Sequence, residues 1–255
     1  MCRADARWKD WKGNLLTPEK VTMHDINTYI IKPPYTKESE SSFVETLPST
    51  AGTQPPRFFV SHTWGGTFFH TMGYIEQMFE DFKENWRQGH DKKGGDMTED
   101  TPIWIYAFAN NQHDLKNAIT VNPSESGFAK AMEVANYRTL SILDKDGDAF
   151  TRVWCILELD LTLIKVQEKK EKGGDYVDVV EWNGLWAVYT AHEHIYGGNR
   201  KAVGIVAGVA TCDIAPYNTA DRERPFPMDR ILKGLDTKTQ NANASIEHDK
   251  RHILN

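Results

Sequence analysis

The stretch Arg57-Phe58-Phe59-Val60-Ser61-His62-Thr63-Trp64-Gly65-Gly66 decides the fold class predicted for this chain. A short apolar run that ends in polar residues and glycines is typical of a buried parallel strand that enters a loop. Apolar residues then recur at alternating steps of four and three, which predicts an amphipathic helix; they are Phe68, Met72, Ile75, Phe79, Phe82 and Trp86. We therefore expect a strand, a loop and a helix, the first unit of an α/β fold.

The same pattern recurs along the chain. Buried strands are predicted at 102–108 and 137–143, and helices at 126–135 and 150–167. Further strands are expected at 176–182 and 201–210, and further helices at 228–235 and 244–254. Strands and helices that alternate at this spacing predict a parallel sheet with helices on both faces.

The sequence divides into three segments. Residues 1–56 are predicted to be an N-terminal extension, because their prolines and a Ser/Glu-rich run resist regular structure; 21–31 is expected to be a short strand or turn that docks on the body. Residues 57–215 form the predicted α/β domain, and 216–255 a C-terminal helical extension. Because the sequence stops within a helical pattern, we expect one module of a longer protein.

Composition narrows the classes of function. The formal net charge of −6 gives no long-range attraction to nucleic acid or to an anionic membrane. Three scattered cysteines predict neither a disulfide framework nor a zinc module, and no apolar run has the length of a membrane span. The charged start lacks a hydrophobic signal core, so we expect a cytosolic protein.

Polar residues follow three of the predicted strands. They are Ser61, His62, Trp64 and Gly65 after the first, Asn110, Asn111 and Gln112 after the second, and Arg152 beyond the loop after the third. Ligands of open parallel sheets bind outside the carboxyl ends of the strands. These residues are therefore candidates for ligand binding.

Glu158 is the candidate for chemistry. It lies in an apolar run, four residues after Trp154 and three before Leu161, so a helix would place all three on one face. A carboxylate is rarely buried alone, because its desolvation is costly. Glu158 therefore either pairs with Arg152 or a neighbouring lysine, or lines a pocket that uses its altered acidity.

Other motifs favour structural roles. Cys155 on an apolar helix is expected to be a small core residue. His62 and His70 do not share a helix face and lack further ligands, so no metal site is predicted. The loop from Asp144 to Asp148 resembles the start of a calcium loop, but Cys155 would stand where the bidentate glutamate belongs.

Two stretches resemble Toll/interleukin receptor (TIR) domains. Phe58-Phe59-Val60-Ser61-His62 is similar to their first-strand box, and Arg152-Val153-Trp154-Cys155-Ile156-Leu157-Glu158-Leu159 to their Trp-Cys-x-x-Glu helix box. The resemblance covers residues 57–167 and implies a flavodoxin-like sheet. The order Ser-His-Thr-Trp-Gly, Asn-Asn-Gln and Arg-Val-Trp with a following Glu also resembles fungal heterokaryon-incompatibility domains.

In enzymatic TIR domains the glutamate of the helix box cleaves the nicotinamide–ribose bond of NAD, so the resemblance implies this role for Glu158. NAD would be the substrate, with no tightly bound cofactor, and self-association would form the site. The remaining expectations are that Trp64 or Trp154 stacks on a base, that Asn110, Asn111 or Gln112 contacts a carboxamide, and that His62 and Arg152 approach the diphosphate.

Other classes of function stay open. The family also contains adaptors that hydrolyse nothing, so the main alternative is a signalling or assembly module that binds a protein partner or nucleotide. A third possibility is a glycosyl transferase that handles nucleosides.

Overall fold

The computed structural model describes residues 8–48, 52–87, 98, 100–114, 125–144, 147–171, 186–193, 200–207 and 232. The predicted strand 176–182 and the predicted helix 244–254 lie outside these residues, as does all of 228–235 except Leu232. Within the described part, no helix is long and apolar enough to cross a bilayer.

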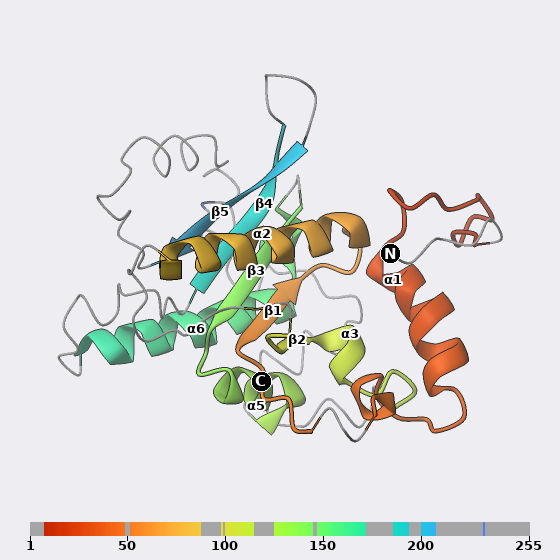
Figure 1. Cartoon of the computed structure of the whole chain (residues 1–255), viewed down its shortest axis with the longest axis horizontal. Helices are drawn as coiled ribbons and strands as arrows, with labels where there is room; N and C mark the ends of the chain where they lie inside the picture. Colours follow the sequence, from red (N-terminus) through yellow and green to blue (C-terminus); the bar gives the residue numbers. More distant parts are fainter. Residues whose placement is uncertain are drawn as a thin grey trace.

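The core of the molecule is a five-stranded sheet (Figure 1). Its strands are β1 (Phe58–His62), β2 (Ile103–Ile105), β3 (Thr139–Leu143), β4 (Trp186–Glu193) and β5 (Arg200–Ala207). They lie in the order β2-β1-β3-β4-β5; the first four are parallel, and β5 runs antiparallel to β4. The predicted α/β architecture with a parallel sheet is therefore confirmed, although β4 was not predicted.

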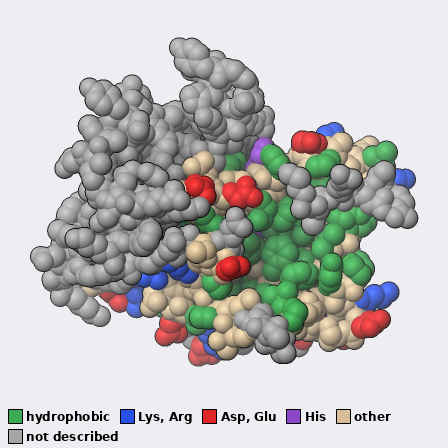
Figure 2. All heavy atoms as spheres, in the orientation of Figure 1, with side chains coloured by type: hydrophobic (Ala, Val, Ile, Leu, Met, Phe, Trp, Pro, Cys, Tyr) green, Lys and Arg blue, Asp and Glu red, His purple; other side chains and the backbone are tan. Residues whose placement is uncertain are grey.

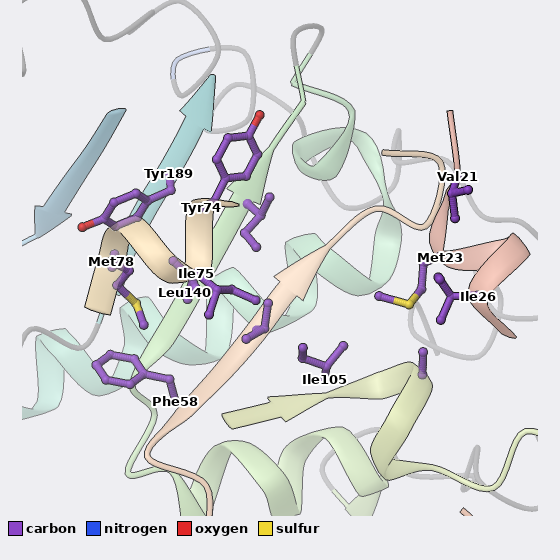
Figure 3. Close-up of a cluster of buried hydrophobic side chains, with 14 of the residues drawn as sticks. Val21, Met23, Ile26, Phe58, Tyr74, Ile75, Met78, Ile105, Leu140 and Tyr189 are labelled. Carbon is purple, nitrogen blue, oxygen red and sulfur yellow. The ribbon is translucent and has the colours of Figure 1, made fainter. Parts of the chain in front are cut away.

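Helices cover both faces of the sheet, as the sequence predicted. Neighbouring side chains of β1 point to opposite faces of the sheet, and each packs against a different helix. Phe58 packs in one cluster with Ile75 and Met78 of α2 (Phe68–Arg87), as Figure 3 shows. Phe59 packs in another with Met132 of α5 (Gly127–Val134). The long helix α6 (Val153–Glu171) lies on the same side as α5.

The second strand is shorter than predicted. The apolar run 102–108 was expected to be extended throughout, but after Ile105 it turns into a single helical turn, α3 (Tyr106–Ala109). Ala107 is fully buried, and the Asn110 amide donates to the Tyr106 carbonyl over 3.1 Å. A continuous apolar run fits a buried helical turn as well as a strand, so its hydrophobicity alone does not distinguish them.

The expectation of a strand or turn at 21–31 is wrong, because this segment is helical. It forms α1 (Met23–Ile26) and continues as a wide, kinked helix, η1 (Asn27–Thr36); a short turn, η2 (Val44–Thr46), follows. The start is fixed by a capping box in which the Thr22 hydroxyl accepts from the Asp25 amide and the Asp25 carboxylate accepts from the Thr22 amide. This Thr-x-x-Asp pattern was readable in the sequence.

The N-terminal segment, residues 8–48, docks on the body and contributes to its core. Val21, Met23, Ile26 and Ile31 are at most 5% exposed and join the cluster of Ile105 and β1 (Figure 3). Around this cluster, partly buried apolar side chains from α2, β2 and the N-terminal segment form a continuous hydrophobic area in Figure 2. The segment is therefore a structural part of the domain.

Candidate functional site

The site lies at the carboxyl ends of β1 and β3. From β1 the chain passes to β2 on one side and then returns to β3 on the other side of β1. Neighbouring connections leave in opposite directions at such a point, which opens a crevice where α/β proteins bind ligands. α6 follows β3 and brings Glu158 against the last residues of β1.

Ser61 and His62, the last two residues of β1, point to opposite faces of the sheet. Ser61 hydrogen-bonds the Glu158 carboxylate, and its register partner Ser141 accepts from the indole of Trp186 on that face. His62 is paired with Ile142, which belongs to the cluster beneath α2. The structure therefore places Ser61 beside Glu158 and directs the His62 side chain toward the other layer.

Glu158 is a buried carboxylic acid with one free oxygen. Its side chain is 5% exposed, and Oε2 has no hydrogen-bond partner among the described residues. Burial raises its pKa to about 8, because desolvation disfavours the charged form, and the hydrogen bond from Ser61 lowers it only in part. A buried carboxyl with a strongly raised pKa at a ligand-binding edge is typical of a functional group.

The interpretation of Glu158 as an ion-pair residue is not supported. Within the described residues the carboxylate makes no ion pair with Arg152 or a lysine, and the Ser61 hydroxyl is its hydrogen-bond partner. Arg152 instead lies just before α6, half-buried, where its charge lowers the pKa values of His24 and Cys155. Burial dominates for the Cys155 thiol and raises its pKa, so this cysteine is a core residue.

A row of half-buried aromatic rings borders this edge of the sheet. The Trp154 ring stacks on Phe128 at 4.9 Å between centroids, and Phe128 stacks on Tyr106 at 4.7 Å. Tyr106 is 5.9 Å from Trp64, which follows β1. We call Trp154, Phe128, Tyr106 and Trp64 the aromatic row. The sequence indicated both tryptophans but missed Phe128 and Tyr106, whose positions beside a helix start and a strand end were the available signal.

Asn110 and Gln112 each place an unpartnered amide atom at this edge. The Gln112 amide nitrogen donates to the carbonyls of Tyr106 (3.2 Å) and Asn110 (3.0 Å), which leaves Oε1 buried without a partner among the described residues. Asn110 Nδ2 is likewise buried and unpartnered there. Asn111 differs, since its amide nitrogen donates to the Glu40 carbonyl and its oxygen accepts from the His113 amide. It joins the loop to the N-terminal segment.

His62 is neutral in this environment. Burial lowers its pKa to about 4, so the imidazole carries no charge near neutrality. Its Nδ1 lies 3.1 Å from the Thr63 carbonyl, which makes Nδ1 the donor and leaves Nε2 as an unpartnered acceptor within the described structure. The expectation that His62 approaches a diphosphate is therefore not supported.

Gly65 is exposed, and a Cβ added there would meet no described atom within 4 Å, so sterics do not require glycine. In the described part of the chain, no group of three or more His, Cys, Asp or Glu side chains is arranged to hold a metal ion.

Several buried polar atoms of the described residues at this edge have no hydrogen-bond partner among those residues. In the described part of the chain as a whole, six buried side-chain atoms lack such a partner: Asn27 Oδ1, His62 Nε2, Thr67 Oγ1, Asn110 Nδ2, Gln112 Oε1 and Glu158 Oε2. Asn110 and Gln112 follow α3, Thr67 lies in the loop after β1, and Glu158 belongs to α6. The His62 side chain is directed toward the other layer, and Asn27 lies in the N-terminal segment. Buried polar groups are normally paired, so these atoms make the edge a candidate ligand site.

Fold and site together define an α/β protein with a candidate ligand site at the crevice where its strand order reverses. No protein-family model matches the chain, and neither a curated protein nor a solved structure is significantly similar to it. The function must therefore be argued from the site itself.

Proposed function

We propose that this protein cleaves the N-glycosidic bond between nicotinamide and ribose in NAD, with Glu158 as the catalytic carboxylate. The observation that carries the proposal is a buried carboxyl at the switch point of the sheet, whose Oε2 has no hydrogen-bond partner among the described residues. Asn110 and Gln112 offer an amide donor and acceptor for the carboxamide, and Trp154 and Trp64 offer rings for stacking.

The chemistry suits a single carboxylate. When the bond between ribose C1′ and the ring nitrogen breaks, its electron pair goes to the positive pyridinium ring, and nicotinamide leaves as a neutral molecule. The ribose becomes oxocarbenium-like, and a nearby anion stabilises that charge. Water or a hydroxyl of the ligand then attacks C1′ and loses a proton. No second carboxyl acid is needed for the leaving group.

The raised pKa of Glu158 is compatible with this role. Without a ligand, a pKa of about 8 leaves most of the carboxyl protonated near neutrality. The pyridinium ring of NAD brings a positive charge, which favours the ionised carboxylate and lowers that pKa. Substrate binding therefore promotes the charge that the transition state requires. Because the Glu158 side chain is buried, the atoms that cover it must move to admit the ligand.

We also propose that the fold is of the flavodoxin-like, TIR type. The order β2-β1-β3-β4 is the doubly wound order in which the second strand lies outside the first. The helix box occupies the start of α6, after β3, as the resemblance to TIR domains implies. The antiparallel β5 departs from an all-parallel sheet.

Incubation of the full chain with NAD tests the activity. We expect nicotinamide to be released at a rate proportional to the enzyme concentration once that concentration is high enough for self-association. Nicotinamide is quantified by chromatography, while the mass of the particle in solution is followed by light scattering. Absence of release from folded protein at every concentration would overturn the proposal, and a concentration-dependent rise in mass without turnover would favour the assembly module.

Gly127→Ala is expected to raise the KM for NAD several-fold. A Cβ at Gly127 would lie 3.2 Å from Asn110 Oδ1, closer than an ordinary contact, so the amide must shift. Gly73→Ala is the matched control, because its Cβ would meet no described atom within 4 Å and glycine is unfavourable within α2. We expect Gly73→Ala to keep KM and to gain about 0.5–1 kcal/mol in urea unfolding. Equal KM values for both variants would contradict a role for Asn110.

A further inference from the structure

The side-chain amide of Gln112 is fixed in one orientation. Its nitrogen has two hydrogens, and it donates to the Tyr106 carbonyl at 3.2 Å and to the Asn110 carbonyl at 3.0 Å. The reverse orientation would place Oε1 against two carbonyl oxygens and lose both hydrogen bonds. Gln112 is only 1% exposed, so no bulk water compensates for that loss. Both N–H groups are therefore committed, and Gln112 can interact with a ligand only as an acceptor through Oε1.

Gln112 Oε1 requires a hydrogen-bond donor. The atom is buried and has no partner among the described residues. A buried amide oxygen normally accepts a hydrogen bond, because its desolvation is otherwise uncompensated. A ligand N–H satisfies this oxygen, whereas a ligand carboxylate or ketone brings a second acceptor against it. Because the amide orientation is fixed, Gln112 cannot adapt to such a ligand by rotating its amide.

Asn110 supplies the complementary group two residues away. Its backbone carbonyl accepts from Gln112 Nε2, and its side-chain Nδ2 is a buried donor that lacks a partner within the described structure. Its Oδ1 lies against Gly127, where an added Cβ would be 3.2 Å away. The loop after α3 thus holds one buried acceptor and one buried donor. A primary carboxamide carries the matching pair, an NH₂ donor and a carbonyl acceptor.

The aromatic row lies beside this loop. Gln112 hydrogen-bonds the backbone of Tyr106, whose ring stacks on Phe128 at 4.7 Å and lies 5.9 Å from Trp64. A flat ligand ring can stack on exposed ring surface of the row while its substituent hydrogen-bonds to the loop. An aromatic ring that carries a primary carboxamide combines both features.

We propose that Gln112 and Asn110 are specificity-determining residues, which select a ligand with a primary carboxamide over the same ligand with a methyl ketone or a carboxylate. A site built around a ligand N–H discriminates strongly, because a ligand without that group leaves the buried acceptor unpaired. The assignment of the carboxamide to the nicotinamide ring of NAD rests on the proposed function. The requirement for an N–H donor follows from the hydrogen bonds of Gln112 alone.

The affinities of three dinucleotides for the Glu158→Gln chain test this preference, since that variant should consume little NAD during the measurement. The second dinucleotide carries 3-acetylpyridine, in which a methyl group replaces the amide nitrogen without a change in charge. The third carries nicotinic acid, whose carboxylate has no donor. We expect calorimetry to show NAD bound at least about tenfold more tightly than the acetylpyridine dinucleotide and at least about 100-fold more tightly than the nicotinic acid dinucleotide. Equal affinities for NAD and the acetylpyridine dinucleotide would overturn the inference.

Gln112→Met in the same chain removes Oε1 and keeps a side chain of similar length. We expect this variant to bind NAD and the acetylpyridine dinucleotide with affinities within about twofold of each other, because the selecting acceptor is gone. Gln167→Met is the matched control, since Gln167 is exposed on α6 and its amide donates to Glu171; it should keep the preference. If both variants kept the preference, Gln112 would not be the selecting group. If thermal unfolding showed that Gln112→Met does not fold, the three ligands on the parent chain would decide alone.

The adenine of NAD is the competing occupant, because it also carries an amino donor beside a ring acceptor. Replacement of adenine by hypoxanthine exchanges that amino group for an oxygen and leaves nicotinamide unchanged. We expect any loss of affinity on this replacement to be the same with and without Gln112→Met. A loss that depends on Gln112 would place adenine at this loop and reject the carboxamide assignment.

Failure of this inference can be told apart from failure of the proposed function. A preference for the carboxamide that depends on Gln112, without nicotinamide release from the wild-type chain, would retain the amide site and reject NAD cleavage. Release with equal kcat/KM for NAD and the acetylpyridine dinucleotide would retain the cleavage and reject the amide site. No measurable binding of any of the three dinucleotides, together with no release, would reject both.

Discussion

Glu158→Gln is expected to lower the rate of nicotinamide release by at least about 100-fold, in the range found when one charge that stabilises a transition state is removed. Glutamine has nearly the same shape, and its side-chain amide can keep the hydrogen bond with Ser61. It cannot carry the negative charge that the oxocarbenium-like ribose requires. The loss should fall mainly on kcat, because the charge matters most in the transition state.

Steady-state kinetics of nicotinamide release at saturating NAD measure this loss. Glu133→Gln is a suitable control, since Glu133 is exposed on α5, and it should match the wild-type rate. Circular dichroism should show both variants folded. If Glu158→Gln turned over NAD as fast as Glu133→Gln did, Glu158 would not be the catalytic carboxylate.

The second large effect is a fall in stability with rising pH that depends on Glu158. The pKa of this carboxyl is raised from an ordinary value of 4.5 to about 8 in the folded protein, so the folded state holds the proton more tightly than the unfolded state. The corresponding stability is fully present below pH 4.5 and is lost as the pH rises through about 8. The slope within this window approaches about 1.4 kcal/mol per pH unit.

His62 acts in the opposite direction over a lower range of pH. Its pKa is depressed from 6.5 to about 4, so the unfolded state binds the proton more tightly, and stability rises with pH between these values. The effects of His62 and Glu158 on stability oppose each other from about pH 4.5 to 6.5. Above that range, of the two, only the effect of Glu158 continues. The range from pH 6.5 to 8 therefore separates the effect of Glu158 from that of His62.

Urea unfolding at pH 6.5 and at pH 8 measures the effect. Wild type should lose about 1–2 kcal/mol between these values, and Glu158→Gln should lose much less, because glutamine does not titrate. Parallel declines in the two proteins would show that Glu158 is solvated and has an ordinary pKa in solution.

Much of the sheet and its helices was predictable because each element has a local pattern. The apolar stripe that begins at Phe68 predicted α2, and Ser126 was expected to begin the helix that it caps in the structure. Successive side chains of a strand alternate between the two faces of its sheet, so the sequence of β1 also implies that Ser61 and His62 point to opposite faces. The capping box at Thr22 would have predicted α1.

The composition of the candidate site was less predictable, because it depends on contacts between distant segments. Trp154 stacks on Phe128, and His24 meets Trp64, through packing that no local period encodes. The depressed pKa of His62 likewise results from its burial in the folded chain. Sequence spacing placed Glu158 on a helix face, but the Ser61 contact and the free oxygen required the tertiary structure.

The buried, unpartnered polar atoms at the sheet edge imply a conflict between stability and activity. Each such atom costs on the order of 1–3 kcal/mol in the folded protein, and among the described residues they include Thr67 Oγ1, Asn110 Nδ2, Gln112 Oε1 and Glu158 Oε2. A chain selected for folding alone would place apolar side chains there, so apolar isosteres such as Thr67→Val should raise the melting temperature. A ligand that satisfies these atoms should raise it as well, which makes a thermal-shift screen a direct route to the natural ligand.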